Sequence, residues 1–96
     1  MLVVVVYDIA TEDRDGKRRL RRVAKKCADK GVAVQDSVYE CKVNAEQYRR
    51  LRDELASIIS PSTDSIYFYL LGNHYQSRIE RLGKERIQWD QETFVI

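Results

Sequence analysis

The chain has 96 residues, of which 44% are hydrophobic and 33% charged, and its formal net charge is only +2. This length fits a single domain, and no apolar run approaches the ~18 residues of a membrane span, so the composition excludes a multidomain protein and an integral membrane protein. A domain of this size buries only roughly 60–65% of its unfolded surface, so any surplus apolar surface indicates a subunit interface. The first residues lack the pattern of a signal peptide, and we expect a cytoplasmic protein.

Residues 2–9, LVVVVYDI, predict a strand buried on both faces, because the run is short and rich in β-branched residues. Along this strand Asp8 shares a face with Val4 and Val6, whereas Tyr7 lies on the other face. A carboxylate at the end of a core strand is costly unless a partner receives it. The strand therefore raises the question of what Asp8 contacts.

A helix follows, because apolar residues recur at i, i+3, i+4, i+7 and i+8, which places them on one face: Leu20, Val23, Ala24, Cys27 and Ala28. Three polar residues before the helix are candidates for its N-cap: Thr11, Asp13 or Asp15. Gly31 is expected to end it as a C′ glycine. Cys27 and Cys41 form no zinc-type cluster, and buried reduced thiols are favoured over a disulfide.

The basic charge of the chain is concentrated in this helix. Residues 14–30 contain nine basic and two acidic side chains, a net charge of +7, whereas the remainder carries −5. Like charges at i, i+4 destabilise a helix by roughly 0.2–0.5 kcal/mol per pair. One interpretation is a solvated helix face. The nearly uniform sign favours the other, a surface that contacts a phosphate backbone without reading sequence.

Residues 32–43 are strand-like but change phase, since apolar residues occupy even positions at the start and odd positions at the end. A bulge or bend near Gln35–Ser37 accounts for the change. The Ser37 hydroxyl could then point toward a site, or it could satisfy the disrupted ladder.

Asn44 and Gln47 resemble a capping box that opens a second helix, whose apolar face is Tyr48, Leu51, Leu55, Ile58 and Ile59. Residues 65–72, SIYFYLLG, predict a strand that is apolar on both faces. Residues 77–83 could add a short strand, and residues 93–96, TFVI, form an apolar end.

The element order predicts an α+β fold, a ferredoxin-like βαββαβ sandwich in which residues 1–96 form one domain. Both helices would cover one face of an antiparallel sheet, leaving apolar residues on the other face uncovered. A symmetric homodimer packed through the sheet faces would cover them. Residues 73–96 are expected to be a C-terminal extension that could pair with the partner subunit, using Phe94, Val95 and Ile96.

Four stretches occur in a characteristic order: VVYDI, the basic helix, QDSVYEC and IYFYLLG. Together they resemble the small CRISPR-associated adaptation proteins of the Cas2 family over nearly the whole chain. The resemblance implies a ferredoxin-like homodimer that assists spacer acquisition with the Cas1 integrase on protospacer DNA. It also implies a Mg²⁺-dependent endonuclease on RNA or double-stranded DNA, with Mn²⁺ as the alternative ion.

The resemblance assigns residues as well. It implies that Asp8 is the metal ligand and the catalytic residue, and that Ser37 is the motif serine, with Tyr7 beside Asp8 as further support for the site. It also implies that the basic positions of the first helix bind nucleic acid: Arg14, Lys17, Arg18, Arg19, Arg21, Arg22, Lys25 and Lys26.

Physical reasoning leaves two interpretations of Asp8. It could be a turn-forming residue that caps the following helix. Alternatively, a two-fold axis near the strand end would bring Asp8 close to its own copy, where two carboxylates repel unless a cation lies between them. Mg²⁺ suits that arrangement because it accepts one or two carboxylates and keeps several waters, one of which could attack a phosphodiester.

Other candidate residues carry weaker signals. His74 follows the last predicted strand without an evident Ser, Cys or Asp partner, which argues against a general base. Tyr67 and Tyr69 could stack on bases, as in RNA-recognition sheets, although core or dimer packing is favoured.

Three functions follow from these observations. The first is a metal-dependent phosphodiesterase with Asp8 as ligand. The second is a non-catalytic scaffold that holds the integrase and duplex DNA. The third is an unrelated ferredoxin-like RNA-binding or regulatory domain.

Overall fold

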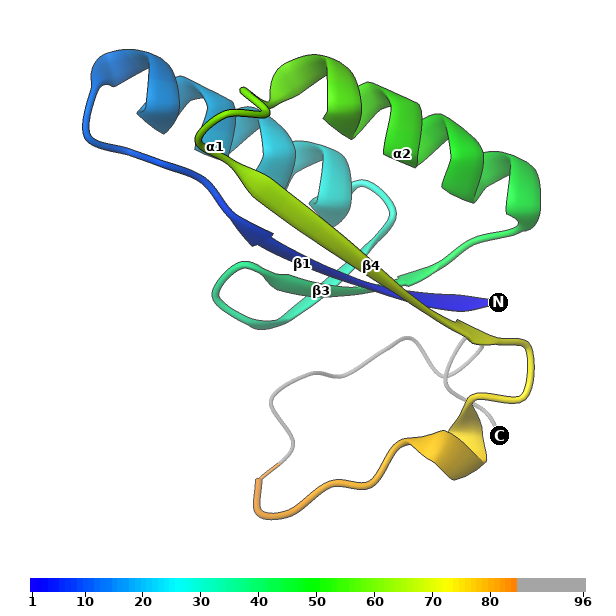
Figure 1. Cartoon of the computed structure of the whole chain (residues 1–96). Helices are drawn as coiled ribbons and strands as arrows, with labels where there is room; N and C mark the ends of the chain where they lie inside the picture. Colours follow the sequence, from blue (N-terminus) through cyan, green and yellow to red (C-terminus); the bar gives the residue numbers. More distant parts are fainter. Residues whose placement is uncertain (85–96) are drawn as a thin grey trace.

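The computed structural model describes residues 1–84, and its first 72 residues form a four-stranded antiparallel sheet with two helices (Figure 1). The strands are β1 (Leu2–Asp8), β2 (Gly31–Gln35), β3 (Val38–Lys42) and β4 (Ser65–Gly72). The helices are α1 (Arg14–Ala28), α2 (Ala45–Ile58) and the short 3₁₀ helix η1 (Gln76–Arg78). The spatial order β2-β3-β1-β4 confirms the predicted ferredoxin-like α+β fold, while packing into a dimer stays a prediction.

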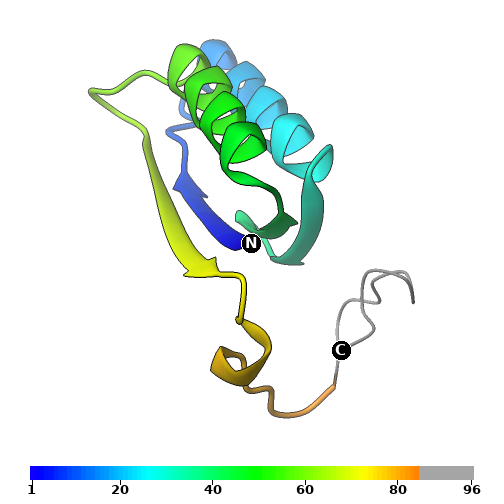
Figure 2. The same cartoon turned by 90° about the vertical axis from the view of Figure 1, so that its right-hand side faces the viewer.

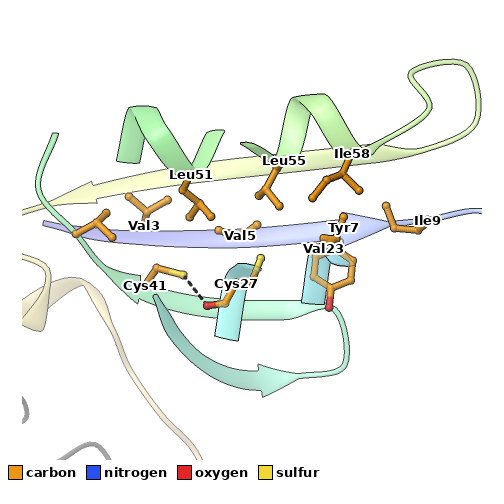
Figure 3. Packing of buried hydrophobic residues seen from close by; sticks show 11 residues of the cluster. Val3, Val5, Tyr7, Ile9, Val23, Cys27, Cys41, Leu51, Leu55 and Ile58 are labelled. Carbon is orange, nitrogen blue, oxygen red and sulfur yellow. Dashed lines mark hydrogen bonds between the residues drawn. The ribbon is translucent and has the colours of Figure 1, made fainter. Parts of the chain in front are cut away.

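Both helices lie on one face of the sheet, as the view turned by 90° shows (Figure 2). Val3, Val5 and Tyr7 of β1 point into the layer between sheet and helices, where they meet Leu51 and Leu55 of α2 (Figure 3). Burial of such side chains is the main favourable term in folding. The sheet face toward the helices is therefore the core, and we call the opposite face the open face.

The two cysteines belong to this core, as expected from their spacing. Cys27 of α1 and Cys41 of β3 are buried free thiols, and the Cys41 Sγ donates weakly to the Cys27 carbonyl at 3.9 Å (Figure 3). Burial raises the pKa of Cys27 to about 12 and that of Cys41 to about 11. Both thiols are therefore protonated and unreactive near neutral pH.

The helix starts agree with the sequence prediction. Asp13 is the N-cap of α1, where its carboxylate accepts from the amide of Gly16 at 2.7 Å. Asn44 and Gln47 form the capping box of α2, with hydrogen bonds of 2.8 and 2.9 Å. Because Asp13 caps α1, Asp8 is not needed for that purpose.

Gly31 does not end α1, and this prediction is wrong. Asp29 is the C-cap, and Gly31 is already the first residue of β2 with no left-handed backbone angle. A glycine is required there for a different reason, because a Cβ would lie 2.1 Å from the carbonyl oxygen of Glu40. The close approach of β2 to β3 therefore explains this glycine.

The phase change in residues 32–43 marks a hairpin between two strands. Gln35 pairs with Val38 across the turn, with a register shift between Ala33 and Gln35, and Ser37 has a left-handed φ of 64°. The expected bend is confirmed. A strand in residues 77–83 is wrong: η1 forms there instead, and no strand follows up to residue 84. Residues 93–96 lie outside the described part of the chain.

No helix among the described residues is both long and apolar enough to cross a membrane.

Candidate functional site

Asp8 is the last residue of β1 and is exposed on the open face. The neighbouring residue on β4 is Ser65, which pairs with it in register. On the other side the β1–β3 ladder ends at Val6, and the Tyr7 amide donates to the carbonyl of Ser37 in the hairpin turn at 3.0 Å. The carboxylate of Asp8 thus stands at one end of the sheet, facing away from both helices.

The open face beside Asp8 is apolar, and nothing within residues 1–84 covers it. Tyr67 and Tyr69 of β4 pair with Val6 and Val4, and the two tyrosines are 60% and 53% exposed. Their rings stack on each other with centroids 6.3 Å apart. Among the described residues the predicted exposed apolar face is therefore present, with Asp8 at its margin.

Asp8 supplies one carboxylate at this end of the sheet. The described residues contain no group of three or more His, Cys, Asp or Glu side chains that could hold a metal ion. A carboxylate oxygen is the donor type that Mg²⁺ prefers, and Mg²⁺ needs only one or two carboxylates from protein. Asp8 therefore fits Mg²⁺ in donor chemistry.

Tyr7 and Ser37 do not lie beside the Asp8 carboxylate. The Tyr7 ring is in the core and stacks on Tyr39 with centroids 6.2 Å apart. Burial and the nearby Tyr39 and Cys27 raise the pKa of Tyr7 to about 12, against a hydrogen bond with the Ser37 side chain that lowers it. The Ser37 hydroxyl thus serves the hairpin turn and the core side of β1.

His74 is far from Asp8 in the same chain. It follows β4, whose first residue pairs with Asp8 and whose last residue, Gly72, pairs with Leu2 at the other end of β1. Seven steps along a strand separate the two ends by about 23 Å. The structure therefore does not bring His74 to the Asp8 end of the sheet.

Asp64 is a buried charged residue that sequence reasoning missed. Its side chain has no exposed surface and forms an ion pair with Arg19 of α1, whose Nε lies 2.7 Å from the Asp64 Oδ2. The same carboxylate accepts hydrogen bonds from the amides of Ala10 and Ser60 and from the Thr63 hydroxyl, at 3.0, 2.9 and 3.2 Å. The signal in the sequence was an aspartate directly before a strand, in a segment that reads only as a helix breaker.

From the pKa of Asp64 we predict how the free energy of unfolding depends on pH. Burial by itself would raise the pKa of Asp64, but hydrogen bonds from Arg19, the Ser60 and Ala10 amides and Thr63 outweigh it and lower the pKa to about 2. A carboxyl with a depressed pKa stabilises the folded state above its unfolded pKa of about 3.8 and loses that contribution as pH falls toward about 2. We expect a loss of about 2 kcal/mol over this window.

Urea denaturation at fixed protein concentration would measure it, by comparison of the wild type with Asp64→Asn. Near neutral pH the wild type should be more stable than Asp64→Asn. The difference between their free energies of unfolding should become smaller as the pH approaches 2. A gap that stays constant over the whole pH range would contradict this assignment.

Gly16, in the first turn of α1, predicts a second stability effect. A Cβ at this position would lie 1.9 Å from the carbonyl oxygen of Ala10. Alanine is favoured over glycine in a helix by about 1 kcal/mol. We nevertheless expect Gly16→Ala to destabilise the fold by about 1–3 kcal/mol, because the backbone must shift. Chemical denaturation would measure this change in the free energy of unfolding.

The control is Lys17→Ala at the exposed neighbouring residue, which should change the free energy of unfolding by less than about 0.5 kcal/mol. If Gly16→Ala changes it by as little, the packing argument is wrong.

Six of the eight predicted nucleic-acid-binding residues are exposed on α1, and we call them the α1 basic surface: Arg14, Lys17, Arg18, Arg21, Arg22 and Lys25. Within the described part of the chain, none of the six forms an ion pair. The other two differ. Arg19 pairs with Asp64, and the Lys26 Nζ lies 2.7 Å from a Glu54 carboxylate oxygen.

The α1 basic surface and Asp8 lie on different layers of the molecule. Val23 and Cys27 of α1 are buried against the sheet, so the exposed basic residues face away from it, whereas Asp8 is on the open face. The two regions approach each other only where β1 leads into α1 (Figure 1). A nucleic acid bound along α1 would therefore not lie across the open face of the same chain.

Comparison with known proteins identifies relatives over most of the chain. The family model described as CRISPR associated protein Cas2 matches residues 1–79. A protein of Chlorobaculum tepidum named CRISPR-associated endoribonuclease Cas2 is 48% identical over 83 residues, which is 86% of each chain. A protein of Halalkalibacterium halodurans named CRISPR-associated endonuclease Cas2 is 45% identical over the same shares.

Solved structures agree with the sequence relatives. The crystal structure of Streptococcus pyogenes Cas2 at pH 6.5 is similar with a TM-score of 0.74 and 49% identity, covering 86% of this chain and all of that one. The family match, the identities and the shared fold lead to one conclusion: the chain belongs to the Cas2 family of CRISPR-associated proteins.

Proposed function

We propose that the chain is a CRISPR-associated endonuclease that acts as a homodimer, with two Asp8 carboxylates near the two-fold axis holding one Mg²⁺ or Mn²⁺. The observation that carries this proposal is the position of Asp8, an exposed carboxylate at the end of a buried strand and at the margin of an uncovered apolar face. The names of the relatives support nuclease activity, some as endoribonuclease and one as endonuclease.

The roles of the chain's own residues follow from their placement. Asp8 supplies the carboxylate, and Tyr67 and Tyr69 supply apolar area that a second copy would cover. The chemistry that a bound Mg²⁺ supplies is Lewis-acid stabilisation of charge on the phosphate oxygens. The α1 basic surface neutralises phosphates without reading bases, which suits RNA and double-stranded DNA alike.

The alternative is a scaffold that assists spacer acquisition with the Cas1 integrase and does not cut. One observation favours it: the α1 basic surface and Asp8 lie on different layers, so duplex bound along α1 is not presented to Asp8 of the same chain. In that function the basic surface tracks the backbone of double-stranded DNA, and Asp8 is dispensable.

Metal removal tests the proposal directly. The purified chain should sediment as a dimer and should cleave single-stranded RNA or duplex DNA in Mg²⁺ or Mn²⁺. Excess EDTA should abolish cleavage because it removes the ion that would supply the Lewis acid. Cleavage by the purified chain that persists in EDTA would contradict the proposed metal dependence. A dimer that cleaves neither substrate in either metal would leave the scaffold as the function.

A further inference from the structure

The side chains of Arg19 and Asp64 form hydrogen bonds with the backbone of Ala10, two residues after Asp8. The amide of Ala10 donates to the Asp64 Oδ1 at 3.0 Å, and the Nη2 of Arg19 donates to the carbonyl of Ala10 at 3.4 Å. Arg19 and Asp64 are themselves joined, with an Nε–Oδ2 distance of 2.7 Å and an Nη2–Oδ1 distance of 3.3 Å. Both polar groups of Ala10 are therefore held by a single ion pair, which we call the Ala10 clamp.

The clamp is connected to Asp8 from a second direction. Asp64 directly precedes Ser65, and Ser65 is the residue that pairs with Asp8 in the β1–β4 ladder. The Asp64 carboxylate also accepts from the amide of Ser60, which fixes the turn that leads into β4. A shift of Asp64 would therefore move both the chain beyond Asp8 and the strand alongside it.

Removing the two charges of the clamp from water costs free energy. The Asp64 side chain is fully buried and that of Arg19 is 19% exposed, and a buried ion pair is often no more stabilising than apolar residues of the same volume. What it provides is a single defined arrangement of the groups it holds. The Nε and Nη2 of Arg19 and both carboxylate oxygens of Asp64 are engaged within the clamp.

We propose that Arg19 and Asp64 are positioning residues for Asp8, which set where its carboxylate stands on the open face by fixing Ala10 and the start of β4. This inference rests on the proposed role of Asp8 as a metal ligand. It gives Arg19 a task different from the phosphate contact of its neighbours on α1. Groups that orient a metal ligand typically change metal affinity or activity by about 10–100-fold when they are replaced.

Two substitutions test the clamp. Asp64→Asn places an NH₂ donor against donors of Arg19 or Ser60, so at least one hydrogen bond is lost. Arg19→Lys keeps the charge but replaces a planar fork by a single ammonium, which cannot hold Asp64 and the Ala10 carbonyl in the same geometry. Glu54→Gln is the matched control, because it breaks a different ion pair of α1, the one between Lys26 and Glu54 of α2, far from Ala10 in the sequence.

Three measurements on the folded full chain decide the question. We expect both clamp variants to weaken Mn²⁺ binding by about tenfold in calorimetric titration, to lower kcat more than they raise KM, and to shift the backbone amide resonances of Asp8 and Ile9. Glu54→Gln should leave all three at wild-type values. The proposal is overturned if both clamp variants lose stability but keep wild-type Mn²⁺ affinity, kcat and Asp8 resonance.

Failure of the proposed function would look different. If the wild type binds no Mn²⁺ and cleaves no substrate, the nuclease assignment fails, and the amide resonances of Asp8 and Ile9 in the two variants alone then decide whether the clamp positions the strand end. If Asp64→Asn does not fold, the same measurements on Arg19→Lys, which keeps the charge on α1, decide whether the clamp positions Asp8.

Discussion

Asp8→Asn is expected to lower metal-dependent cleavage by at least about a hundredfold while leaving the affinity for duplex DNA within about twofold. Loss of a group that merely orients a ligand already costs about 10–100-fold, so loss of the ligand itself should cost at least as much. Binding should persist because the α1 basic surface lies on the helix layer and Asp8 on the open face. Cleavage kinetics in Mg²⁺ and a DNA titration in EDTA would measure the two effects separately.

The control for Asp8→Asn is Asp53→Asn, which removes the same charge from an exposed carboxylate on α2, 70% exposed in its side chain. It should change neither cleavage nor binding. Should Asp8→Asn cleave as fast as the wild type, Asp8 is not the metal ligand of a nuclease. Spacer acquisition in cells then separates the two proposed functions: acquisition that survives Asp8→Asn makes the scaffold the relevant one, and acquisition that stops makes catalysis relevant.

The parts of the fold that follow from local chemistry could be predicted from the sequence. The apolar run of β1, the phase change at the hairpin, the Asn44–Gln47 capping box and the apolar stripe of α2 each depend on residues close together in the chain. Gly31 could not be interpreted in this way. A glycine is required at this position because a Cβ would collide with the carbonyl of Glu40 in β3, nine residues away, and not because α1 ends there.

In the candidate site, too, the features that depend on local sequence could be predicted, and those that depend on distant residues could not. The placement of Asp8 on the open face follows from strand alternation, since every second residue of β1 shares its side. The ion pair that distinguishes Arg19 from its basic neighbours on α1 could not be predicted from local sequence, because its partner, Asp64, is 45 residues later in the chain. A run of basic residues looks uniform in sequence, and only the fold shows which member has a buried partner. The ion pair of Lys26 with Glu54 was hidden for the same reason.

The other large effect concerns the α1 basic surface. Arg18, Arg21 and Lys25 follow one stripe of the helix and are exposed. Replacing all three by Gln should weaken duplex DNA binding by about a hundredfold or more, because each neutralised phosphate releases condensed counterions. The slope of log K against log salt should become shallower by about 2.7 for double-stranded DNA, at about 0.9 per lost contact. The loss should be the same for unrelated DNA sequences, since phosphate contacts carry no base readout.

The matched control removes three charges from the other helix, by Gln at Arg49, Arg50 and Arg52 of α2. Arg50 and Arg52 lie beside carboxylates, with Arg50 2.9 Å from Glu46, so their charge is already partly neutralised. The α2 variant should therefore keep most of the wild-type affinity and salt slope. The same loss in both triple variants would show that net charge alone attracts DNA. An unchanged slope in the α1 variant would make its arginines a solvated helix face, and its repulsive i, i+4 pairs would then be only a cost of roughly 0.2–0.5 kcal/mol each.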